Sequence, residues 1–214
     1  MVQPTGFSVA PRRTTFLTDR GRERNQNSRP MPDLDAQSFR IAVPASTSNL
    51  GPGFDLLGLA LSLELEVTLR PGRPGGPSTL VRPDAETEGW PAQGDLLVIA
   101  FERAREAFGA ERSPVELCVR SEIPIARGLG SSGAAVVAGL LLGAALASSA
   151  VPREQILRMA VELEGHPDNV TPALYGGLCL SFVRPGGAPR VVALEPHPRL
   201  AFAVAWPRAT LATA

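Results

Sequence analysis

The stretch that most constrains this 214-residue chain is PIARGLGSSGAA, Pro124 to Ala135, a glycine- and serine-rich loop directly before a long apolar run. Glycine permits tight turns, and a helix that begins here directs its unpaired N–H groups and positive dipole end at the loop. Such a junction is suited to binding an anion. The same pattern also fits a plain strand-to-helix turn capped by serine, so the loop alone leaves both interpretations open.

The loop differs from two common phosphate-binding motifs. A P-loop requires Gly-Lys-Ser/Thr, but every basic residue of this chain is arginine. The dinucleotide fingerprint requires a third spaced glycine and a downstream ribose-binding acid, and both are missing. The lack of lysine also excludes a lysine phosphate clamp and a Schiff base.

Composition predicts a globular domain without a nucleic-acid or membrane partner. The chain is 44% hydrophobic, and 21 basic residues balance 21 acidic ones. Its longest apolar stretch, residues 133–147, is shorter than the roughly 20 residues of a membrane span, so we expect a buried helix. Cys118 and Cys179 stand alone in strand-like segments, which predicts buried free thiols and favours a cytoplasmic location.

Hydrophobic periodicity predicts an α+β fold. Apolar residues alternate over 61–69, as in a half-buried strand, and follow helical spacing over 94–110. Further strands are expected at 39–46, 115–124, 176–183, 190–194 and 200–207, and further helices at 132–147 and 152–164. The chain ends after a strand-like run, which predicts that a longer architecture continues beyond it.

Residues 1–38 differ in composition from the rest of the chain. They are rich in arginine and polar residues and have no hydrophobic periodicity, which predicts disorder. An organelle transit peptide is one interpretation, and a translation start at Met31 is the simpler one.

Two further polar stretches are candidates for recognition. PASTSNLGPGFDLLG, residues 44–58, carries Asn49 and Asp55 in a turn between two expected strands. ELEGHPDNVTPALYGG, residues 162–177, carries polar side chains where we expect a helix to give way to a loop. Polar clusters on loops held by a rigid scaffold are frequent recognition sites.

The three segments together resemble the GHMP kinase superfamily and, within it, the homoserine kinases. The family's phosphate loop reads Pro-x-x-x-Gly-Leu-Gly-Ser-Ser, and PIARGLGSS matches it at every fixed position. SNLGPGFD and EGHPDNVTPALYGG resemble the homoserine kinases more than the mevalonate or galactose kinases. The resemblance extends from about Phe39 to the C-terminus.

The resemblance implies a fold as well. Residues 39–195 would form the N-terminal ATP-binding lobe, a ribosomal-protein-like two-layer domain with a mixed, mostly antiparallel sheet covered by helices. Residues 196–214 would begin a ferredoxin-like C-terminal lobe that is largely absent. Because that second lobe closes the family's cleft, a chain ending here should be weak or inactive.

It implies ATP and Mg²⁺ as cofactors. Ser132 and Glu162 would contact the metal, and Glu164 is the alternative to test beside Glu162. The residues implied to surround the ATP phosphates are Pro124, Ile125, Ala126, Arg127, Gly128, Leu129, Gly130, Ser131, Ser132 and Gly133.

The implied second substrate is L-homoserine, phosphorylated on its hydroxyl on the route to threonine. Its pocket would use Asn49, Asp55, His166 and Asn169, with Asp55 as partner of the ammonium group. Asn169, Asp168 and Glu162 are the implied catalytic residues. Because an amide cannot take a proton at neutral pH, catalysis would depend on alignment and charge stabilisation.

Three departures from the family pattern bear on these expectations. Gly133 replaces an alanine, Asp95 stands where the family has an asparagine near the adenine, and the chain stops before an arginine that binds the substrate carboxylate. Two alternatives therefore stay open: a kinase for another small alcohol, and a nucleotide-binding fragment without turnover. A homodimer is neither supported nor excluded.

Overall fold

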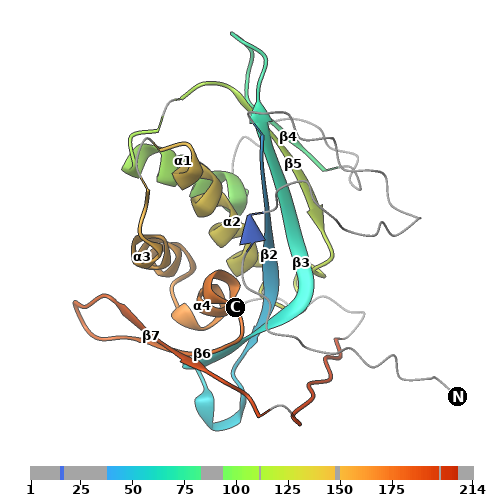
Figure 1. The fold of residues 1–214 in the computed structure, drawn as a ribbon, viewed down its shortest axis with the longest axis vertical. Coiled ribbons are helices and arrows are strands. Elements are labelled where there is room, and N and C mark those ends of the chain that lie inside the picture. The colour runs from blue at the N-terminus through green and yellow to red at the C-terminus, as the bar shows by residue number, and fades with distance from the viewer. Residues whose placement is uncertain are drawn as a thin grey trace, which may run out of the picture.

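The computed structural model describes residues 15–16, 38–82, 94–110, 112–147, 150–197 and 199–206. In these ranges a sheet is covered on one face by four helices, as Figure 1 shows. The helices are α1 (Leu96–Ala107), α2 (Ser131–Ala145), α3 (Arg153–Glu164) and α4 (Pro167–Tyr175). The strands are β1 (Thr15–Phe16), β2 (Phe39–Ser48), β3 (Leu57–Pro71), β4 (Thr79–Val81), β5 (Val115–Ser121), β6 (Leu178–Val183) and β7 (Pro189–Leu194).

The sheet is organised around β3. Its first residues pair with β6 and its last with β5, while β2 runs along nearly its whole length. All of these pairings are antiparallel, and the β4–β5 pair is parallel. The α+β fold with a mixed, mostly antiparallel sheet is confirmed.

A β-bulge interrupts the β2–β3 ladder between Pro44 and Ser46. At this bulge the Ser46 N–H donates to the Leu129 carbonyl at 3.2 Å, outside the sheet. The two extra residues lie in β3, because Ala45 alone stands opposite residues 61–63, and such a bulge releases backbone groups from the ladder. The end of β2 is therefore attached directly to the loop before α2.

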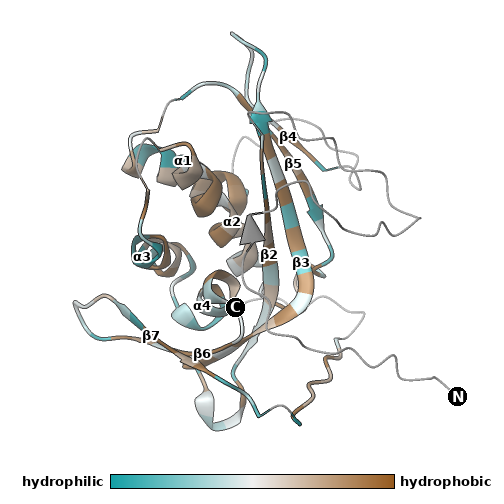
Figure 2. Cartoon of the chain, in the orientation of Figure 1, coloured by the Kyte–Doolittle hydropathy of each residue, from teal (hydrophilic) through white to brown (hydrophobic). Residues whose placement is uncertain are grey.

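The core lies between the sheet and the helices. Figure 2 shows hydrophobic residues gathered on α1, α2 and the strands behind them. Phe101 of α1, Leu140 of α2 and Ile41 of β2 are fully or almost fully buried there. Both cysteines are buried free thiols, as expected, and burial raises the pKa of the Cys179 thiol to about 11.

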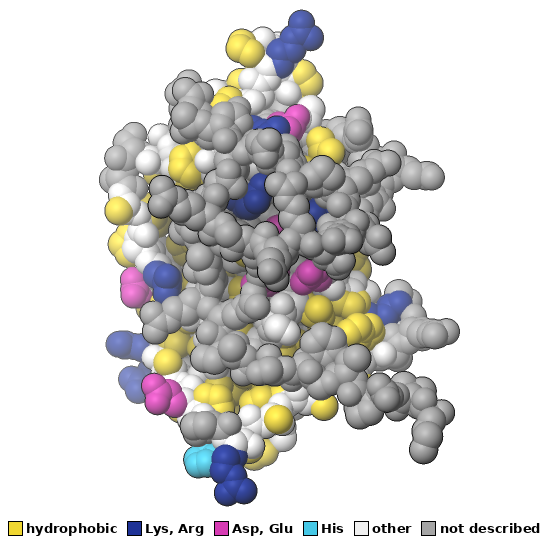
Figure 3. All heavy atoms as spheres, turned by 45° about the vertical axis from the view of Figure 1, so that its right-hand side comes forward, with side chains coloured by type: hydrophobic (Ala, Val, Ile, Leu, Met, Phe, Trp, Pro, Cys, Tyr) yellow, Lys and Arg dark blue, Asp and Glu magenta, His cyan; other side chains and the backbone are white. Residues whose placement is uncertain are grey.

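The helix expected at 132–147 is α2, packed in this core. None of the described helices is both long and apolar enough to cross a membrane. On the face drawn in Figure 3, described arginine and acidic side chains are interspersed with hydrophobic ones. That mixture agrees with the balanced charge of the sequence.

Three sequence expectations need correction. Residues 167–175 form α4 instead of a loop, because Pro167 is tolerated at the first helical position and Gly165 ends α3 in the left-handed conformation. Described residues 200–206 form no strand, because no described strand pairs with them. Thr15 and Phe16 pair with β2, so the expected disorder of residues 1–38 does not hold there; the other residues of 1–37 lie outside the described ranges.

Candidate phosphate and substrate site

The glycine-rich loop connects β5 to α2 and turns through left-handed backbone. The φ angles are 54° at Ala126, 71° at Gly128 and 64° at Gly130. Gly130 is the residue before α2, and no side chain caps the helix. The serine cap is therefore not formed, and the first N–H groups of α2 point toward the loop without a side-chain acceptor.

Ser132, in the first turn of α2, contacts the last residue of α3. Its Oγ donates to Glu164 Oε1 at 2.5 Å. Both side chains are half-buried. A hydroxyl and a carboxylate held together present the oxygen ligands that Mg²⁺ prefers.

Glu162 lies elsewhere. Its carboxylate accepts from Arg103 Nη2 at 3.4 Å, and both side chains are about half exposed, at 51% and 54%. Residues two apart on a helix point in nearly opposite directions, because each residue turns the helix by about 100°. The structure thus does not bring together the expected metal pair, Ser132 and Glu162, and Glu164 takes the position beside Ser132.

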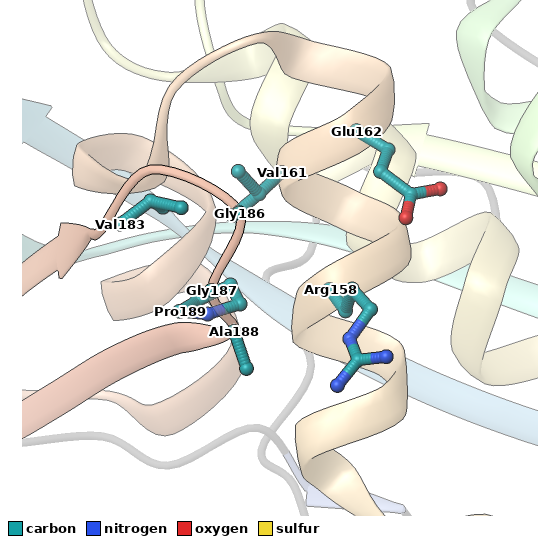
Figure 4. Close-up of a pocket in the computed structure, with 8 residues that line it drawn as sticks. All are labelled: Arg158, Val161, Glu162, Val183, Gly186, Gly187, Ala188 and Pro189. Carbon is teal, nitrogen blue, oxygen red and sulfur yellow. The ribbon is translucent and has the colours of Figure 1, made fainter.

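Glu162 also borders a pocket that is separate from the glycine-rich loop. This pocket lies between α3 and the β6–β7 hairpin, as Figure 4 shows, and its volume is about 310 Å³. Arg158 and Val161 line it with Glu162 from α3, facing Val183 and residues 186–189 of the hairpin. No residue of the glycine-rich loop lines it, so this hollow is not the expected phosphate site.

Asn169 is held by side chains from two elements. It lies in the first turn of α4, where its Oδ1 accepts from Ser46 Oγ at 3.0 Å. Its Nδ2 donates to Ser48 Oγ at 3.1 Å and to Asp168 Oδ1 at 3.3 Å. Two hydrogen bonds therefore hold this amide against the end of β2, and a third joins it to Asp168 of α4.

His166 and Asp168 extend the same network. His166 Nδ1 lies 2.6 Å from Asp168 Oδ1, with 50% of the histidine side chain but 3% of the aspartate side chain exposed. Because a carboxylate oxygen only accepts, the histidine donates from Nδ1 and its Nε2 stays available. The Asp168 carboxylate thus contacts the side chains of both His166 and Asn169.

Asn49 and Asp55 lie in the exposed turn between β2 and β3. Asn49 Nδ2 donates to Ser48 Oγ at 3.4 Å, and Asn49 Oδ1 accepts from the Asp55 N–H at 3.1 Å. Their φ angles of 59° and 58° are left-handed, a region that Asn and Asp enter more readily than other non-glycine residues. The Ser48 hydroxyl thus joins this turn to Asn169.

The network lies directly against the first turn of α2. A Cβ added at Gly130 would overlap the Ser46 hydroxyl and lie 3.2 Å from Asn169 Oδ1. One added at Gly133 would lie 3.4 Å from the Asn169 Cβ. The structure therefore brings Asn49, His166, Asp168 and Asn169 together beside the glycine-rich loop.

Sequence reasoning missed Ser46 and Ser48. Two serines spaced by two in a strand share one face, which could have indicated a paired role. Asp95 caps α1 by accepting from the N–H groups of Leu97 and Val98, and it binds Arg82 at 2.6 Å. These contacts identify Asp95 as the N-cap of α1.

Comparison with known proteins agrees with this geometry. The family named GHMP kinases N terminal domain matches residues 95–177, which include the glycine-rich loop, α2 and α4. The chain belongs to the GHMP kinase superfamily. In this member of the superfamily, the glycine-rich loop before α2 lies against the end of β2 and the first turn of α4.

The most similar relatives found include homoserine kinases. The chain is 41% identical to the homoserine kinase of Leifsonia xyli over 186 residues, which cover 85% of this chain and 57% of that protein. It is 41% identical to that of Synechococcus sp. strain CC9605, covering 83% of this chain and 57% of the relative. The chain thus spans somewhat more than half the length of the curated relatives it matches.

Solved structures show the same fold. The homoserine kinase of Cytophaga hutchinsonii superposes with a TM-score of 0.61 at 31% identity, covering 77% of this chain and 54% of that one. The mevalonate kinase of Methanococcus jannaschii superposes with the same TM-score of 0.61 at 13% identity, covering 75% of this chain and 57% of that one. The second likeness concerns the fold alone.

Proposed function

We propose that this chain is the ATP-binding part of a cytoplasmic homoserine kinase. It transfers the γ-phosphoryl group of ATP to the hydroxyl of L-homoserine and forms O-phospho-L-homoserine for threonine biosynthesis. Residues 39–195 are the ATP-binding domain, and residues 196–214 begin a second domain. The observation that carries this proposal is the hydrogen-bonded group of Asn49, His166, Asp168 and Asn169 beside Gly130.

Residues 124–133 hold the ATP phosphates in this proposal. The uncapped N–H groups of α2 supply hydrogen-bond donors, and the helix dipole adds a favourable potential for an anion. With no lysine in the chain, backbone N–H groups, serine hydroxyls and Arg127 are the donors that this segment offers to the phosphates. A phosphoryl-transfer reaction of this kind depends on positioning and electrostatics.

Ser132 and Glu164 hold Mg²⁺, with Glu164 in the role that the family resemblance implied for Glu162. The fit rests on the 2.5 Å contact between their oxygens. The described residues contain no cluster of three or more His, Cys, Asp or Glu side chains, which suits a cation that keeps phosphate and water ligands. When bound, Mg²⁺ neutralises charge on the transferring phosphoryl group.

The substrate residues have distinct roles. Asp55 pairs with the ammonium group of homoserine, and Asn49 and His166 orient the rest of the molecule. Asn169 aligns the hydroxyl, because an amide cannot serve as a general base. Alignment of the hydroxyl with the γ-phosphate is then the main contribution of these side chains.

An ADP-release assay with L-homoserine, mevalonate and shikimate tests the proposal. Release that depends on homoserine supports it, whereas release with another alcohol identifies a different GHMP kinase. Thermal stabilisation by Mg²⁺-ATP without release under any acceptor would identify a nucleotide-binding fragment. That last outcome is the alternative suggested by the 57% coverage of the relatives.

A further inference from the structure

Ser46 occupies an unusual place in this site. It is fully buried at the end of β2, next to the bulge, and its N–H is donated to Leu129 of the glycine-rich loop. Its hydroxyl lies beneath Gly130 and donates to Asn169 Oδ1 at 3.0 Å. One residue thus contacts both the glycine-rich loop and α4.

The orientation of the Asn169 amide follows from its neighbours. Asp168 Oδ1 can only accept, so the amide nitrogen of Asn169 must lie on the aspartate side at 3.3 Å. The amide oxygen therefore faces Ser46, and the Ser46 hydroxyl must donate. Rotation of the amide by 180° would bring two acceptors together and is disfavoured.

The hydrogen-bond capacity of Asn169 is then almost fully used. Its two amide hydrogens are directed to Ser48 and Asp168, and one lone pair of Oδ1 accepts from Ser46. An amide oxygen has two lone pairs, so one acceptor position remains. Asn169 can accept a hydrogen bond from a hydroxyl group but has no donor left for it.

We propose that Ser46 is a positioning residue that fixes Asn169 as a hydrogen-bond acceptor beneath the first turn of α2. That the incoming hydroxyl belongs to homoserine rests on the proposed function. The contacts of Ser46 with Asn169 and the glycine-rich loop are independent of it. An acceptor holds the hydroxyl by its hydrogen and leaves the oxygen lone pairs for the phosphorus atom. Ser46 thereby sets the direction of the substrate hydroxyl through Asn169, without contacting the substrate itself.

The experiment combines NMR with kinetics. The full chain contains four asparagines, so asparagine labelled with ¹³C and ¹⁵N gives few side-chain signals, and loss of a signal in N169S assigns Asn169. The variants are S46A, which removes the donor, and S46C, which keeps a side chain of similar length with a weak donor. S181A is the matched control, because Ser181 is also fully buried and its hydroxyl has no hydrogen-bond partner among the described residues.

Ser46→Ala should shift the Asn169 carbonyl signal and lower kcat with homoserine about tenfold, the effect of one lost hydrogen bond, with the KM for ATP unchanged. Ser46→Cys should shift the Asn169 carbonyl signal and lower kcat in the same direction. It replaces the alanine variant in the test if that variant does not fold. Ser181→Ala should change neither. An unshifted carbonyl signal in both Ser46 variants would overturn the proposal. If the unsubstituted chain releases no ADP with homoserine, it is the nucleotide-binding fragment described above, and the carbonyl signal alone decides the role of Ser46.

Discussion

The start and the middle of α2 use glycine for different reasons. At the N-cap, directly before the first turn, Gly130 adopts a left-handed backbone and leaves room for Ser46 and Asn169. Further along, Gly139 and Gly143 are helical and let the backbone of α1 approach closely. The first glycine belongs to the polar site and the other two to helix packing, so one residue type in one helix serves two separate purposes.

The largest effect is expected from Gly139→Ala, which tests the packing half. The added Cβ would overlap the Leu97 carbonyl oxygen and lie 2.8 Å from the Ala100 Cβ, so α1 would have to move. We expect a loss of about 3 kcal/mol in the free energy of unfolding, the upper part of the range for overpacking. Urea unfolding measures it, and Mg²⁺-ATP affinity below the transition should be unchanged. An unchanged free energy of unfolding would show that the two helices do not need glycine at their contact.

This packing half is the part that the sequence predicted well. The apolar run at 133–147 and the spacing over 94–110 indicated two buried helices, and α2 and α1 lie there. Helical periodicity is a local property, so the sequence carries it directly. The close approach of the two backbones depends on their crossing, and local spacing does not reveal it.

The polar half was predicted less completely. Motifs identified Asn49, His166 and Asn169. The structure connects Asn49 to Asn169 through Ser48, and His166 to Asn169 through Asp168. The choice between Glu162 and Glu164 could not be made from sequence, because it depends on which way the last turn of α3 faces. Helix α4 was missed because two prolines within nine residues disfavour a helix locally, whereas Pro167 sits at its first position.

Gly130→Ala should have the next largest effect and tests the polar half. The substitution strains a residue with φ of 64° and displaces the Ser46 hydroxyl. We expect a loss of about 2 kcal/mol in the free energy of unfolding, from backbone strain and the disturbed hydrogen bonds. Unlike the Gly139→Ala variant, the folded Gly130→Ala variant should also bind Mg²⁺-ATP more weakly, as measured by calorimetry. Unchanged affinity would contradict the separation of the two halves.

Glu164→Gln, compared with Glu162→Gln, sharpens the description of the first turn of α2. Loss of the carboxylate beside Ser132 should weaken Mg²⁺-dependent ATP binding about tenfold, because Mg²⁺ prefers charged oxygen ligands. The Glu162 variant loses an exposed ion pair and should lose less than 1 kcal/mol of stability. A titration of ATP affinity against Mg²⁺ compares the two variants, and urea unfolding measures the stability of the Glu162 variant. The reverse order would restore the assignment of Glu162 that the sequence suggested.

The smallest effect is expected from Gly133→Ala, between the two halves. Its added Cβ would lie 3.4 Å from the Asn169 Cβ and 3.5 Å from Val170 Cγ1, which is ordinary contact. Alanine should therefore stabilise the helix by up to about 1 kcal/mol through its higher helix propensity. A rise in the thermal midpoint with unchanged ATP affinity would check it, and a fall would mean that Asn169 cannot tolerate the methyl group.

The two serines at the end of β2 make the site more sensitive to insertions and deletions than the sheet is. Side chains alternate between the two faces of a strand, so removing Ala45 would send Ser46 and Ser48 to the opposite face or break their register with β3. The strands could still pair, and the hydrophobic core would keep most of its residues. A family member with a one-residue gap at this position would therefore resemble this fold while lacking the serine contacts to Asn169.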